Sequence, residues 1–209
     1  MRSIIENNVI TQIINDGSTT LFIPEDAHEI DEVLLYGGWP EELETIEVAP
    51  QNTHFVFVNR CLIHKDTHTL VMALNDSLIP TDQGIEVIGT GAFGNNTTTQ
   101  EIIIPDSVWL LEASCFSNSC IKKITLPPTV ELVRGNAFGI CPQLSEIIVL
   151  GAETEFEISA FAKLLNDGRP MPKAFLEYLN PNLVIEAPSP SFAEECAKIN
   201  SIQYKELTV

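Results

Sequence analysis

Apolar residues recur at a fixed spacing through the middle of the chain. Three consecutive segments share this spacing: 85–105, 108–127 and 130–150. Each begins with an aliphatic residue, has a second one three positions later and a phenylalanine eight positions later. The phenylalanines, Phe93, Phe116 and Phe138, are 23 and 22 residues apart. This period indicates a repeat protein, because so small a unit cannot bury its apolar face alone and must stack on its neighbours.

An alternating pair of apolar residues follows each phenylalanine and predicts a short strand that buries one face. The pairs are Ile102/Ile104, Ile124/Leu126 and Ile147/Val149. Proline closes several such strands, at Pro24, Pro80, Pro105 and Pro127, because it cannot donate to a ladder. A fainter copy lies upstream at Ala27, Ile30 and Leu35, with a strand at Ile46/Val48. The periodic array therefore spans residues 20–150.

The stacked units predict an α/β fold, a right-handed solenoid with one parallel sheet of short strands and a core of stacked phenylalanines. The residue before each phenylalanine is small, which leaves room for a tight turn. Apolar residues at helical spacing predict two short helices between 155 and 180. A last strand at 183–187 follows. A capping box of Ser191 and Glu194 then opens a final helix.

These motifs resemble the BspA-like leucine-rich repeat family, whose pattern I-x-x-I-G-x-x-A-F-x-x-C-x-x-L-x-x-I-x-I-P runs through the repeats. The segments 55–74 and 187–207 are similar to the strand pair and the terminal cap of that family. The resemblance implies one leucine-rich-repeat domain over 1–209. Its parts are an N-terminal cap at 1–19, repeats at 20–150 with a hairpin-like insert at about 52–78, and a helical C-terminal cap at 151–209.

Charge narrows the choice of partner. The 209 residues include 11 Lys and Arg against 29 Asp and Glu, a net charge of −18, and residues 1–50 hold eleven acids and one base, Arg2. Such an excess repels phosphate backbones and anionic membranes, so we expect a protein partner, preferably basic, and no nucleic acid. No segment is long and apolar enough for membrane insertion, and none resembles a signal peptide. As it stands the sequence predicts a cytoplasmic protein, whereas a trimmed start would allow a secreted or cell-surface one.

The sheet offers a candidate binding face. If the alternating pairs point inward, the residues between them point outward. The predicted outward set is Phe22, Thr45, Glu47, Glu101, Ile103, Lys123, Thr125, Glu146 and Ile148. Exposed aliphatic and aromatic side chains on a sheet are natural contact points. Alternatively, the end helices or a loop cover them.

Two groups of residues could support other chemistry. His64, Asp66 and His68 alternate and would be weak metal-ligand candidates on one strand face, although their segment also fits a hairpin turn. Cys120 and Cys141 occupy the same place in adjacent repeats, so they are either within disulfide reach or free thiols that pack as small apolar groups. No Ser/His/Asp set and no Cys-x-x-Cys motif occurs, which predicts no enzyme activity and no cofactor.

Two functions remain open. The family resemblance implies a non-enzymatic protein-binding domain of the kind used by bacterial surface proteins in adhesion and host interaction. The alternative is an intracellular acidic immunity protein or inhibitor that neutralises a basic toxin or nuclease.

Overall fold

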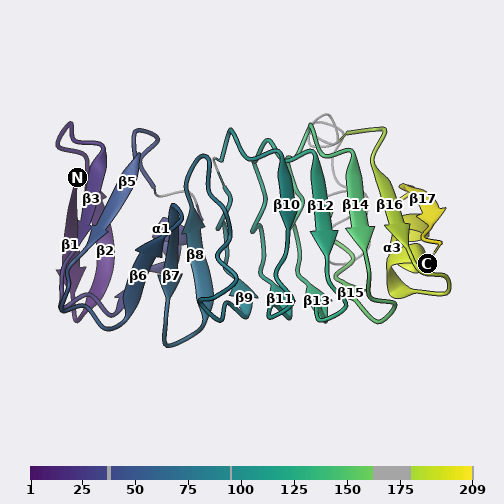
Figure 1. Cartoon of the computed structure of the whole chain (residues 1–209). Helices are drawn as coiled ribbons and strands as arrows, with labels where there is room; N and C mark the ends of the chain where they lie inside the picture. The colour runs from purple at the N-terminus through teal and green to yellow at the C-terminus, as the bar shows by residue number, and fades with distance from the viewer. Residues whose placement is uncertain (37–38, 95, 162–179, 209) are drawn as a thin grey trace.

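The computed structural model describes residues 1–36, 39–94, 96–161 and 180–208, which form an elongated stack of strands running from the N-terminus to the C-terminus (Figure 1). The strands belong to three sheets. The structure confirms a solenoid of stacked parallel strands with few helices.

The N-terminal sheet has the order β4-β2-β1-β3-β5. Its strands are β1 (Arg2–Glu6), β2 (Val9–Ile14), β3 (Thr20–Ile23), β4 (Glu29–Ile30) and β5 (Thr45–Val48). β1 and β2 form an antiparallel hairpin, and the other pairs are parallel. A single helical turn, α1 (Glu32–Leu35), follows β4, and the Asp31 side chain caps it by accepting a hydrogen bond from the Val33 N–H.

The repeats form two ladders of parallel strands, and the second ladder continues into the antiparallel strands of the insert. One ladder contains β10 (Glu101–Ile103), β12 (Lys123–Leu126), β14 (Glu146–Val149), β16 (Val184–Ala187) and β17 (Gln203–Glu206), in that order. The other has the order β15-β13-β11-β9-β8-β7-β6. Its members are β6 (Phe55–Val58), β7 (Cys61–His64), β8 (Thr69–Ala73), β9 (Val87–Ile88), β11 (Leu110–Leu111), β13 (Leu132–Val133) and β15 (Glu155–Phe156).

The expectation of one parallel sheet was therefore wrong in its number of sheets. β9, β11 and β13 contain two residues each, too few for a period of two to show in the sequence. The ladder that contains β10 also does not continue to β5. Residues 77–80 form no strand, and the Leu78 N–H instead donates to the Asn59 carbonyl of the insert.

The core is a column of phenylalanines. Phe93, Phe116, Phe138 and Phe161 are at most 1% exposed, and successive ring centroids lie 5.0, 5.7 and 5.5 Å apart. The backbone repeats with the rings, since the Phe93 N–H donates to the Cys115 carbonyl at 2.7 Å. Phe116 and Phe138 donate to Ala137 and Ala160 in the same way. A small residue before each phenylalanine thus lets adjacent turns approach closely enough to hydrogen-bond.

Residues 158–161 do not form the start of the first helix predicted within 155–180, and the rest of that helix, 162–165, lies outside the described residues. Residues 158–161 form a turn, β15 pairs with β13, and Phe161 stacks on Phe138, so the repeat register continues beyond residue 150. The apolar residues at 158 and 161 fit the spacing of a helix as well as that of the repeat, so the sequence alone does not distinguish a helix from a further repeat here. The second predicted helix, over 172–179, lies outside the described residues.

The C-terminal helix α3 (Phe192–Ile199) lies between β16 and β17. The Ser191 hydroxyl accepts a hydrogen bond from the Glu194 N–H at 3.1 Å, which confirms the N-cap. The reciprocal half of the capping box is replaced, because the Glu194 carboxylate accepts from the Ser189 hydroxyl and the Lys198 ammonium.

The antiparallel strands β6, β7 and β8 separate two apolar cores. Cys61, Ile63 and Leu70 point into the phenylalanine core, while Leu62 and Val71 point into a second core. That second core also contains Ile10, Leu21, Leu34, Trp39 and Ile46 of the N-terminal region. The insert therefore lies between the core of the repeats and the core of the N-terminal region and contributes side chains to both.

The phenylalanine column yields a first prediction. Replacing Phe116 by alanine should lower the free energy of unfolding by about 3–5 kcal/mol, because it removes a fully buried ring that touches two others. Phe22→Ala is the matched control, since Phe22 is 47% exposed and should cost less than about 1 kcal/mol. Urea denaturation of both variants would measure the difference, and equal losses would contradict this account of the core.

Candidate protein-binding surface

The outward side chains of β10, β12 and β14 form one surface, which we call the repeat face: Glu101, Ile103, Lys123, Thr125, Glu146 and Ile148. The strands pair in register, so Glu101, Lys123 and Glu146 form one row and Ile103, Thr125 and Ile148 form the next. Beneath them Ile124 and Ile147 are fully buried. The buried residues between the rows fix the strands, so the outward positions are held rigidly.

The two rows differ in chemistry. In the first row, the Lys123 ammonium is ion-paired with the Glu146 carboxylate, and this hydrogen bond raises the pKa of Lys123. In the second row, Ile103 is 78% exposed, while Thr125 and Ile148 are half-buried. The predicted covering by end helices or a loop does not occur at Ile103. The repeat face therefore presents an exposed aliphatic side chain beside a row of charges.

Three residues of the predicted set lie elsewhere. Phe22, Thr45 and Glu47 belong to the N-terminal sheet, where Phe22 pairs with Glu47 across β3 and β5. Because β5 and β10 are in different sheets, the structure does not join these residues to the repeat face. They form a separate surface on which Phe22 is 47% exposed.

The sequence prediction missed Leu78, which is 74% exposed. Leu78 stands two residues before Pro80, as Ile103 stands two residues before Pro105. That shared offset was a signal that could have identified it. It was missed because the insert hides the repeat at this point.

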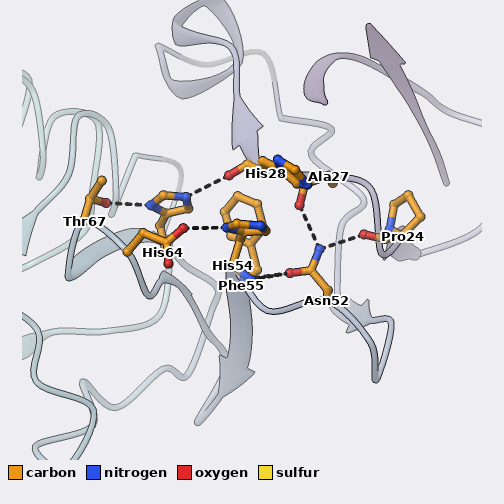
Figure 2. A network of polar contacts seen from close by, with 9 residues as sticks. Pro24, Ala27, His28, Asn52, His54, Phe55, His64 and Thr67 are labelled. Carbon is orange, nitrogen blue, oxygen red and sulfur yellow. Dashed lines mark hydrogen bonds and ion pairs between the residues drawn. The ribbon is translucent and has the colours of Figure 1, made fainter. Parts of the chain in front are cut away.

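The histidines do not form the metal site that alternation suggested. The His64 Nε2–H donates to the His28 carbonyl at 2.8 Å, and the His64 Nδ1 contacts the Thr67 hydroxyl at 2.7 Å (Figure 2). Asp66 pairs with the His54 ring at 2.5 Å, and His68 faces the Gly84 carbonyl. His64, Asp66 and His68 therefore have three different partners. Within the described part of the chain, no three His, Cys, Asp or Glu side chains are placed to hold an ion.

These histidines instead join the insert to the N-terminal region. The His28 and His54 rings lie 4.1 Å apart between centroids, next to the His64 contact with the His28 carbonyl. Asn52 extends the junction, because its amide donates to the Pro24 and Ala27 carbonyls and accepts from the His54 and Phe55 N–H groups (Figure 2). The polar network has a structural role that the sequence did not reveal.

The cysteines are free thiols. The Cys141 thiol lies 3.0 Å from the Phe116 carbonyl, and the Cys120 thiol points to the Thr99 carbonyl. Burial raises the pKa of Cys61 and Cys196 to about 12, that of Cys141 to about 11, and that of Cys115 well above its ordinary value. Thiols with such pKa values are protonated at neutral pH and act as packing groups.

Two cavities beside α1 had no counterpart in the sequence prediction. They measure about 360 and 470 Å³ and share Leu35 and Tyr36 in their lining. Their described lining residues fall within 32–36 and 39–41 and within 67–94 and 110–118, which are far apart in the chain, so no local motif could have indicated them. None of the helices that the structure describes has the length and hydropathy of a membrane span.

Comparison with known proteins supports the fold. Residues 71–166 match the BspA type leucine rich repeat region in six copies, which confirms the resemblance seen in the sequence. A leucine-rich repeat protein from Eubacterium ventriosum is 18% identical with a TM-score of 0.53, over 90% of this chain and 48% of that one. A leucine rich cell surface protein from Faecalibacterium prausnitzii is 17% identical with a TM-score of 0.65, over 97% of this chain and 52% of that one. The chain thus spans about half the length of these structures, and no curated protein matches it.

The buried thiols yield a second prediction. Because their pKa values are raised on folding, they stabilise the fold fully below pH 9 and lose that contribution as the pH rises towards 11–12. The free energy of unfolding should fall in this range by up to about 1.4 kcal/mol per pH unit for each thiol. Cys115→Ala is the matched variant, since Ala92 and Ala137 occupy the equivalent places. Its pH slope, measured by denaturation between pH 8 and 10.5, should be shallower, and an unchanged slope would refute this assignment.

Proposed function

Because residues 71–166 are a BspA-type leucine-rich repeat region, we propose that the chain is a protein-binding domain and that the repeat face is its contact surface. The observation that supports this most directly is Ile103, an aliphatic side chain that is 78% exposed on β10, the edge strand of a sheet whose inner side is packed. Burying such a side chain in a complex releases its hydration at little entropic cost, because the strand is already ordered.

The surroundings of Ile103 suit a protein contact. Thr125 and Ile148 continue the row at the same height, and the charged row with Lys123 and Glu146 runs beside it. An apolar centre next to charges is typical of specific interfaces, in which the centre contributes affinity and the charges select the partner. We further propose that the contact serves adhesion at a cell surface, since the similar structure from F. prausnitzii is that of a leucine rich cell surface protein.

The repeat face yields a third prediction. The double variant Ile103→Arg/Thr125→Arg should reduce capture of the partner at least tenfold, because two bulky cations replace the apolar row. Capture would be measured by mass spectrometry from cell lysates and from purified extracellular-matrix proteins.

The control variant is Ile199→Arg/Thr129→Arg, which changes the same residue types at exposed positions outside the repeat face. It should retain every partner. If the repeat-face variant also retained every partner at wild-type strength, this face would have no part in binding.

A second candidate function is favoured by the charge of the N-terminal region. Of the eleven acidic residues in 1–50, all but Asp31 are exposed. Such a surface suits a neutraliser that covers the basic cleft of a toxin or nuclease. We expect this function to show as capture of one basic protein that is lost when the salt is raised from 0.05 to about 0.5 M, because screening shortens the range of exposed charges. Salt-resistant capture through the repeat face would favour adhesion instead.

A further inference from the structure

The two cavities beside α1 form one surface depression, which we call the α1 groove. Leu35 and Tyr36 line both cavities, so the depression continues past the side of α1. Its combined size lies in the range of sites that take side chains or small ligands. The groove lies over the sheet that contains β9 and β11, and the repeat face belongs to the other ladder. It is therefore a separate surface.

The floor of the groove is apolar. Val87 and Leu110 pair in register on β9 and β11, beside Ile88 and Leu111, which are fully buried in the core. Val87 is half-buried and Leu110 is only 5% exposed, so Val87 supplies most of the accessible apolar surface of this pair. Leu35 closes the floor from the side of α1. Its carbonyl approaches Gly91 so closely that a Cβ there would lie 2.1 Å away, and Gly91 has a φ of +64°. Gly91 thus permits the contact that seats α1 against the repeats.

The rim of the groove carries one sign of charge. Its described lining includes Glu32, Glu41 and Glu112 and no Lys, Arg or His. Glu112 is compensated by Arg134 at 3.2 Å. Glu32 and Glu41 are exposed and make no ion pair with a described residue, and the Tyr36 ring between them is 62% exposed. Two uncompensated carboxylates and an aromatic ring thus surround an apolar floor.

We propose that the α1 groove binds an extended segment of a protein partner in which a lysine or arginine adjoins an aliphatic residue. The aliphatic side chain would lie on Val87 and Leu35. The long stem of the basic side chain would pack on Tyr36, which also attracts its cation, and the cation would reach Glu32 or Glu41. The proposal rests on the proposed function only in taking the ligand to be a protein.

Selection from a random heptapeptide library tests this chemistry without knowledge of the natural partner. The whole chain, immobilised at 0.05 M salt, should select peptides in which Lys or Arg adjoins Leu, Ile or Val. A selected peptide, labelled and measured by fluorescence anisotropy, should bind about tenfold more weakly to Glu32→Lys/Glu41→Lys, since each reversal replaces an attraction by a repulsion. Tyr36→Ala should weaken binding about threefold or more.

The matched control is Asp106→Lys/Glu153→Lys, which changes the net charge equally at exposed acids outside the groove. It should leave the anisotropy titration within about twofold of wild type. Equal weakening by both double variants would reduce the effect to net charge and overturn the proposal, as would selection of no peptides or of peptides without basic residues. The Glu32→Lys/Glu41→Lys chain should itself select acidic peptides, which shows that it remains folded. Ile103→Arg/Thr125→Arg should not affect these peptides, so the groove and the repeat face can fail separately.

Discussion

The stacking of one phenylalanine on the next determines the geometry of the whole repeat region. Phe116 and Phe138 are each buried between two other rings, and the N–H groups of Phe93, Phe116 and Phe138 donate to the carbonyl of the small residue at the same place in the next turn. The side-chain and backbone contacts require the same separation between turns. A larger residue at Ala92 or Ala137 would increase the distance between adjacent turns and so separate both the backbones and the stacked rings. The core and the ladders therefore form cooperatively, as expected of a solenoid in which each turn contacts only its neighbours.

The insert interrupts this regularity and separates the surfaces that we propose for binding. Strands β6, β7 and β8 bury residues on both sides, so the N-terminal sheet packs on the insert and not on the next repeat. As a result the outward residues divide into the repeat face and the surface around Phe22. The same arrangement places α1 against the turn at Gly91 and leaves the α1 groove beside it. Asn52 and His64 hold this arrangement through hydrogen bonds to backbone carbonyls.

Much of the fold could be predicted because the residues that make each contact recur at equivalent positions in several repeats. Ile102, Ile124 and Ile147 occupy equivalent places in the sequence, and the structure pairs them in register. The features that the sequence did not predict are either strands too short to show a pattern or surfaces built from segments far apart in the chain. The two-residue strands β9, β11 and β13 show no alternation, and Phe161 fits two periods at once. Of the candidate site, the six repeat-face residues were placed together correctly, whereas the α1 groove joins segments that no local spacing connects.

Charge and apolar exposure have different parts in this molecule. The net charge of −18 is spread over many exposed acids, so most of it sets the long-range electrostatic field around the molecule. Short-range recognition needs apolar area that the fold holds in place, and we propose that Ile103 on one ladder and the α1 groove on the other supply it. Since the two surfaces lie on different ladders, one partner could contact both only by wrapping around the solenoid. Two separate partners, or two segments of one flexible chain, fit this geometry better than a single compact domain.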